Sequence, residues 1–146
     1  MTDFQASASR QGRNFEQAVE SMLVAFGWSI EGVRVTHACG VEVDIVAIDP
    51  GKVRWYIECK GSHRGQVPGA KRGDTVKKAV GVAWYLKHHD PGCKYMLVTS
   101  HMPRSESVGG RMLDDARRVG LFDAISVLAL STIAYDEDLP DDEAES

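Results

Sequence analysis

Two short alternating segments joined by a tight turn constrain the fold of this chain most strongly. Apolar and polar residues alternate over residues 41–49 and 53–60, and the Asp-Pro-Gly-Lys sequence at positions 49–52 is typical of a turn. A third alternating segment precedes them at residues 29–39 and is ended by Gly40. Short alternating segments linked by turns predict antiparallel strands that pair in sequence order. The centre of the chain is therefore predicted to be a β-meander.

The remaining segments predict helices and further strands around this meander. In each helical segment the apolar residues recur at steps of three and four, and Gly27 and Asp74 or Thr75 act as caps. Phe26 is predicted on the apolar face of the first helix, and the three tryptophans are predicted to lie in the core. Helices are predicted at residues 14–26, 76–88 and 104–118, further strands at 95–99 and 124–130, and a glycine-rich loop at 61–73. The predicted fold class is α/β, with a central mixed sheet flanked by helices.

The chain has 146 residues, which is enough for one domain with its own hydrophobic core. No segment has the apolar length of a membrane span, and the N-terminus lacks the apolar centre of a signal peptide. The three cysteines form no CxxC pair, which argues against a zinc finger or a disulfide scaffold and for a reducing cytosol. We therefore expect a cytoplasmic protein that does not bind membranes.

The net charge of -4 hides an uneven distribution. Residues 136–146 hold seven of the 21 acidic residues and no basic one, which leaves a positive balance over residues 1–135. Residues 52–94 contain ten Lys or Arg against three acidic residues. We therefore predict a domain at 1–135 and an acidic C-terminal tail at 136–146, which either only adds solubility or shields a basic groove.

Three charged residues of the meander form a candidate catalytic group. Glu58 and Lys60 share one face of their strand, and Asp44 lies on the neighbouring strand across the turn. Two carboxylates and a backbone carbonyl, such as that of Cys59, suit an oxygen-ligated Mg²⁺ or Mn²⁺ ion. With a lysine beside it, such an ion can promote phosphodiester hydrolysis. The alternative is a solvated sheet surface, because an E-x-K triplet is common by chance.

The segment GVEVDIVAIDPGKVRWYIECKGS resembles the core motif of the PD-(D/E)xK, or restriction-endonuclease-like, nuclease superfamily. The preceding QGRNFEQAVESMLVAFGWSI is similar to the first helix of archaeal-type Holliday junction resolvases and of type IV restriction endonuclease nuclease domains. The resemblance covers roughly residues 11–100. It implies an αβββαβ core, here with an extra C-terminal helix and strand. Two departures are Val43 in place of the motif's proline and Ala38-Cys39-Gly40 in place of a serine-bearing loop.

The resemblance implies a Mg²⁺-dependent DNA endonuclease, restriction-like or junction-resolving, that acts as a homodimer in a prokaryotic or phage-type context. Asp44, Glu58 and Lys60 would be its catalytic set. Glu16 would complete the site, either as an auxiliary metal ligand or as a residue that supports the ligands, and Glu20 is the alternative to Glu16. A modular restriction enzyme would also need a partner chain for target recognition. The alternative function is a non-catalytic nucleic-acid-binding or assembly module that retains the fold.

Basic residues that follow the motif are candidate phosphate contacts. This candidate DNA-binding set is Arg64, Lys71, Arg72, Lys77 and Lys78. His63 is predicted to be a solvated loop residue, and His88 and His89 are predicted to complement the end of a helix rather than to bind metal.

Overall fold

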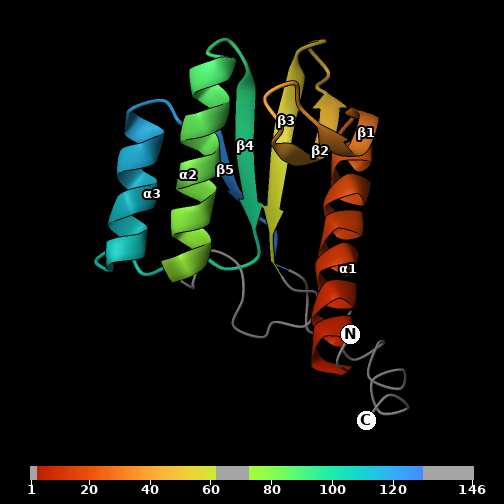
Figure 1. The fold of residues 1–146 in the computed structure, drawn as a ribbon. Helices are drawn as coiled ribbons and strands as arrows, with labels where there is room; N and C mark the ends of the chain where they lie inside the picture. The colour runs from red at the N-terminus through yellow and green to blue at the C-terminus, as the bar shows by residue number, and fades with distance from the viewer. Residues whose placement is uncertain (1–2, 62–72, 130–146) are drawn as a thin grey trace.

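The computed structural model describes residues 3–61 and 73–129, and it forms a five-stranded mixed sheet between two layers of helices (Figure 1). The elements are α1 (Asp3–Ala25), β1 (Ser29–Thr36), β2 (Glu42–Ile48), β3 (Arg54–Lys60), α2 (Gly73–His89), β4 (Lys94–Thr99), α3 (Val108–Arg118) and β5 (Ala124–Val127). The α/β class and the predicted order of elements are confirmed. In the part of the chain that is described, no helix is both long and apolar enough to cross a membrane.

The strands lie in sequence order, β1-β2-β3-β4-β5. The first three form the predicted antiparallel meander, whereas β4 is parallel to β3 and β5 is parallel to β4. The register of β2 and β3 runs from Ile48 opposite Arg54 to Ile45 opposite Ile57, and it goes no further. Beyond this point β3 continues to Lys60 beside β4 alone. The two strands therefore form a fork at the end of the sheet where β3 terminates.

Two hydrophobic clusters hold the layers together, one on each face of the sheet. On one face α1 packs against β2, β3 and β4, and on the other face α2 and α3 cover β4 and the neighbouring strands. The first cluster contains Phe15, Val19, Leu23, Ile45, Ala47, Ile57, Met96 and Val98. The second contains Val76, Ala79, Ala83, Leu86, Tyr95, Leu97, Leu113, Ala116 and Phe122. Successive residues of β3 and β4 thus alternate between the clusters, as a period of two requires.

The end of α1 differs from the prediction. The helix begins at Asp3 and ends at Ala25, and Phe26 is 73% exposed instead of lying on the apolar face. Gly27 has a φ of 91°, its N–H bonds to the Val24 carbonyl, and the Trp28 N–H bonds to the Leu23 carbonyl. This left-handed C-terminal turn directs the chain back to the sheet, so that Trp28 packs on the core while Phe26 points outward.

The prediction that Trp84 lies in the core is also wrong, because the residue is 56% exposed and its ring stacks on His88. The buried residues of α2 are Val76, Ala79, Ala83 and Leu86. Each step of four residues turns by roughly 40° beyond a full revolution, so Trp84 lies roughly 80° from Val76 around the helix. Trp84 therefore lies off the buried face of α2. Trp28 and Trp55, by contrast, pack against the core as predicted.

Some element bounds differ from the predicted ones by a few residues. The third helix begins at Val108 rather than in the lead-in from residue 104, because Ser107 caps it and accepts a hydrogen bond from the Gly110 N–H. The first strand ends at Thr36 and the last at Val127. The acidic tail at 136–146 and the domain bound at 135 lie outside the described residues.

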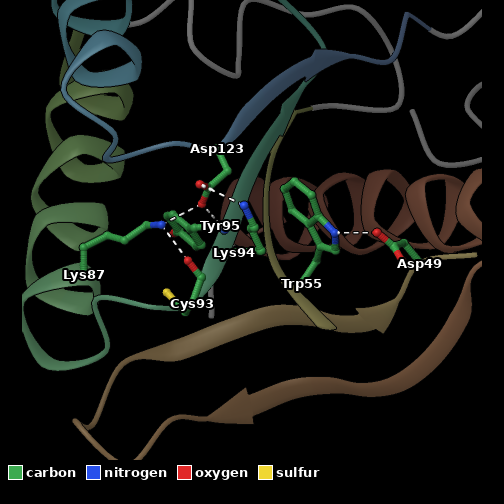
Figure 2. A network of polar contacts seen from close by, with 7 residues as sticks. All are labelled: Asp49, Trp55, Lys87, Cys93, Lys94, Tyr95 and Asp123. Atoms are coloured by element: carbon green, nitrogen blue, oxygen red, sulfur yellow. Dashed lines mark hydrogen bonds and ion pairs between the residues drawn. The ribbon is translucent and has the colours of Figure 1, made fainter. Parts of the chain in front are cut away.

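A polar network ties the elements together at the end of the sheet away from the fork (Figure 2). The Asp123 carboxylate accepts hydrogen bonds from Lys87 Nζ at 2.6 Å and from the Tyr95 N–H at 2.8 Å. Lys87 also donates to the Cys93 carbonyl at 2.6 Å. The network therefore joins the C-terminal end of α2, the start of β4 and the chain that enters β5.

Candidate active site

Asp44 lies at the fork, one residue beyond the last β2–β3 pair. Its Oδ2 accepts a hydrogen bond of 2.8 Å from the backbone N–H of Cys59. The Asp44 side chain thus accepts a hydrogen bond from a backbone N–H of β3 at the point where β2 no longer pairs with β3. This bond fixes the Asp44 carboxylate beside the strand that carries Glu58 and Lys60.

Glu58 is a nearly buried carboxyl group, with 7% of the residue exposed. Tyr95 donates its hydroxyl to Oε2 at 3.2 Å, and Lys60 Nζ lies 3.3 Å from Oε1. Burial, followed by the negative charge of Asp44 and a hydrogen bond with it, raises the pKa of Glu58 to about 7, although Lys60 lowers it. Glu58 therefore keeps its proton to a higher pH than an ordinary glutamate does, beside the carboxylate of Asp44.

Lys60 is the last residue of β3, and its side chain is partly exposed beside Glu58. The predicted arrangement of Asp44, Glu58 and Lys60 on one sheet surface therefore matches the geometry. Cys59, between Glu58 and Lys60, packs in the cluster on the α1 face, as the alternation predicts. Burial raises the pKa of its thiol, so the side chain acts as an apolar group, while the role of its carbonyl stays a prediction.

Glu16 reaches the same region from α1. The negative charge of Asp44 contributes to raising its pKa, second to burial, and it also acts on Cys59. One oxygen, Oε2, accepts a hydrogen bond of 3.1 Å from Arg34, whereas Oε1 is buried without a hydrogen-bond partner. A buried carboxylate oxygen without a partner is costly, because it has lost water and gained nothing. Glu20, the alternative, lies one turn away, and its charge also acts on Glu16 and Cys59.

Close packing at the end of β3 holds α1 near the site. A Cβ atom at Gly61 would lie 2.8 Å from the Phe15 ring and 2.8 Å from Ser100 Oγ. Only glycine leaves this space free, so the ring that precedes Glu16 can sit directly against the strand end. The glycine after the E-x-K triplet therefore helps to bring the helix and its carboxylate to the fork.

Arg34 is a site residue that the sequence analysis missed. It lies in β1 between Val33, opposite Ile45, and Val35, opposite Val43, and hence beside Asp44 in the ladder. Its φ of 52° is in the left-handed region, which is unusual for a non-glycine residue in a strand. Its basic character was visible in the sequence, but nothing in the alternation of residues 29–39 indicated this conformation or the contact with Glu16.

The predicted DNA-binding residues are only partly described. Arg64, Lys71 and Arg72 lie outside the described residues, as does His63. Lys77 and Lys78 are exposed near the start of α2, at the end of the molecule where β3 terminates (Figure 1). His88 and His89 are exposed at the other end of α2, in ring contacts with Trp84 and Tyr85.

The site brings three carboxyl groups and an amine together at the fork. Among the described residues, no group of three or more His, Cys, Asp or Glu side chains is arranged to hold a metal ion. Mg²⁺ does not require one, since it takes one or two carboxylates and keeps several waters. The neighbouring carboxyl groups of Asp44 and Glu58, the raised pKa of Glu58 and the buried, partnerless Oε1 of Glu16 fit one or two carboxylate contacts to a divalent cation.

No protein-family model matches this sequence, and no curated protein matches it significantly. Among solved structures, the chain is similar to an EndoMS–dsDNA2 complex, with 13% identity and a TM-score of 0.47, over 79% of this chain and 45% of that chain. It is also similar to a repair endonuclease from Pyrococcus abyssi, with 14% identity and a TM-score of 0.47, over 88% and 48% of the two chains. The chain is similar as well to SfsA from Pyrococcus furiosus in complex with Ca²⁺, with 15% identity and a TM-score of 0.49, over 84% of this chain and 57% of that chain.

This chain thus spans about half the length of each of these proteins. Likenesses at these identities and TM-scores carry no argument about chemistry.

Proposed function

We propose that this chain is a metal-dependent DNA endonuclease of the PD-(D/E)xK type. The observation that carries the proposal is the arrangement of charges at the fork. The nearly buried Glu58 lies next to Lys60 and feels the charge of the half-buried Asp44, which also acts on Glu16, whose Oε1 is buried without a partner. A merely solvated surface would not bury the Glu58 carboxyl group or leave a buried oxygen of Glu16 unsatisfied.

Asp44 and Glu58 are the proposed ligands of Mg²⁺, for which Mn²⁺ would substitute. Glu16 contributes Oε1 directly or through a water molecule, and the carbonyl of Cys59 is a further candidate ligand. When bound, the ion would neutralise charge on a phosphate and favour deprotonation of an attacking water. The pair is suited to this role, because a cation can replace the proton that Glu58 otherwise holds.

Lys60 has a separate part in the proposal. Its ammonium group lies 3.3 Å from Glu58 Oε1 and is partly open to solvent, so that it can contact both the carboxylate and an incoming group. It can orient a water for attack, and it can stabilise the negative charge that grows on the phosphate. The hydrogen bond from the Cys59 N–H to Asp44 holds this carboxylate beside β3.

Double-stranded or branched DNA is the proposed substrate, with Lys77 and Lys78 as phosphate contacts on α2. Cutting both strands needs two sites, so a homodimer belongs to the proposal. Junction-resolving and restriction-like cleavage are both compatible with this site, the latter with a partner chain for target recognition. We place this activity in the cytoplasm.

Cleavage of a supercoiled plasmid and of a four-way junction, each with Mg²⁺ or Mn²⁺, tests the proposal. The Asp44→Asn and Lys60→Ala variants should each lower the cleavage rate by about 100-fold or more, because each loses a group that acts on the reacting phosphate. The Asp114→Asn and Lys94→Ala variants, which remove similar charges far from the fork, should cleave like wild type.

Cleavage that is indifferent to Asp44→Asn and Lys60→Ala would refute the catalytic assignment. Wild-type protein that binds both DNA forms without cutting either would instead support the non-catalytic binding module. The form of DNA that is cut decides between the junction-resolving and restriction-like activities.

A further inference from the structure

The backbone of Arg34 adopts a conformation that its residue type disfavours. At φ 52° the Cβ atom of an L-residue crowds its own backbone, and glycine is the residue that avoids this. Arg34 lies within β1, whose register with β2 is regular from Gly32 to Thr36. Strain of this kind persists where the surrounding structure enforces it, and it concentrates at functional sites.

The conformation brings the Arg34 side chain to the fork. Its Nη2 lies 3.1 Å from Glu16 Oε2, and this ion pair joins the edge strand β1 to α1. The Glu16 side chain is only 13% exposed, whereas that of Arg34 is 46% exposed. The guanidinium group therefore contacts the Glu16 carboxylate on one side and solvent on the other.

A guanidinium group carries five N–H donors, and the contact with Glu16 uses one nitrogen. The remaining solvent-facing donors are arranged in a planar fork that matches the oxygens of a phosphate. A surface salt bridge of this exposure contributes little to stability, so the ion pair alone does not explain why the strain is kept.

We propose that Arg34 is a phosphate-contacting residue of the site, which holds Glu16 with one nitrogen and binds a phosphate of the nucleic acid with its free donors. This inference rests on the proposed function, because it assumes that nucleic acid approaches the fork. It adds a basic residue on a second side of the sheet to the proposed DNA-binding surface. Lys77 and Lys78 lie on α2, on one side of the sheet, whereas Arg34 reaches α1 on the other side (Figure 1).

The test is the affinity for a four-way junction and for a duplex of matched length, measured in a chelator so that no cleavage occurs, over a series of salt concentrations. Arg34→Gly is the decisive variant, because glycine takes the observed φ without strain while the guanidinium group is lost. We expect its affinity to fall about tenfold and its slope of log affinity against log salt to shrink by about one. Its melting temperature should stay close to that of wild type.

Two further variants separate a specific contact from a general effect of charge. Arg34→Lys should restore the salt slope, but only part of the affinity, because an ammonium group lacks the planar fork. Arg54→Ala removes an equally charged residue that pairs with Glu31 at the other end of β3, and it should bind like wild type.

Equal affinity and equal salt slope in Arg34→Gly and wild type would overturn the inference, and so would an equal loss in Arg54→Ala. Either result would leave the proposed nuclease intact, since wild type would still bind and cut. The absence of DNA binding and cleavage in wild type itself would instead remove the proposed function.

Discussion

At the scale of single residues, the energetic cost of the site is concentrated in Glu58. A carboxyl group with 7% exposure loses most of its hydration, and the nearby Asp44 charge opposes its ionisation. The Tyr95 hydroxyl and Lys60 compensate only in part. This residue therefore makes the metal-free protein sensitive to pH.

The stability of the metal-free protein should fall as the pH rises from about 4.5 to 7. The folded-state pKa of Glu58 lies above its ordinary value, at about 7, so the folded state binds more protons than the unfolded state in this window. The contribution of Glu58 should lower the free energy of unfolding by about 2–3 kcal/mol over this pH range. Urea unfolding in chelator at several pH values would measure it.

The Glu58→Gln variant has no proton to lose at this position and should lack this part of the slope. The Glu106→Gln variant, which changes an exposed carboxylate paired with Arg104, should keep the wild-type pH dependence. If Glu58→Gln retains the full slope, the loss of stability comes from other groups.

At the scale of elements, the two ends of the sheet differ in structure: one carries the fork and the other carries the Asp123 network. At one end β2 and β3 separate beside Asp44 and Glu58, whereas at the other end the Asp123 network joins the elements. The Asp123 carboxylate joins Lys87 of α2 to the start of β4, and both side chains of this ion pair are mostly buried. The network therefore links α2, β4 and the start of β5 at the end of the sheet opposite the fork.

Asp123→Ala should destabilise the protein by about 2–4 kcal/mol, because it leaves the Lys87 charge and the Tyr95 N–H without this partner. The matched control is Asp114→Ala, which removes an exposed carboxylate paired with Arg118 within α3 and should cost less than about 0.5 kcal/mol. Chemical unfolding measures both. Similar losses in the two variants would show that the Asp123 network contributes no more than a surface ion pair.

At the scale of the whole molecule, ligand binding and folding are linked. Residues that repel one another at the fork lower the stability of the metal-free protein, and any cation that binds only the folded state restores it. Metal binding should therefore be measurable as thermal stabilisation, without any assay of cleavage.

Mg²⁺ or Mn²⁺ at ten times its dissociation constant should stabilise the fold by about 1.4 kcal/mol. For a chain of this size this corresponds to a rise in melting temperature of roughly 3–6 °C. The rise should disappear in Asp44→Asn and persist in Asp114→Asn. An undiminished rise in Asp44→Asn would place the ion elsewhere in the protein.

The sequence by itself determined the order of the elements and the meeting of Asp44, Glu58 and Lys60. Alternation has a period of two fixed by the backbone, and a four-residue turn brings the neighbouring strand within reach, so both features are local. The sequence could not place Phe26 or Trp84, because a small rotation at a helix end or along a helix moves a side chain from core to solvent.

Only the tertiary structure decided which groups surround the carboxyl pair. Tyr95 reaches Glu58 from a strand 37 residues later, and Arg34 reaches Glu16 through a left-handed backbone conformation. These contacts depend on how layers pack and where two strands separate, and such positions are set by the competition of many side chains for the same core volume. The sequence therefore predicted Asp44, Glu58, Lys60 and Glu16, whereas packing determined their partners, among them Arg34, their burial and the pKa of Glu58.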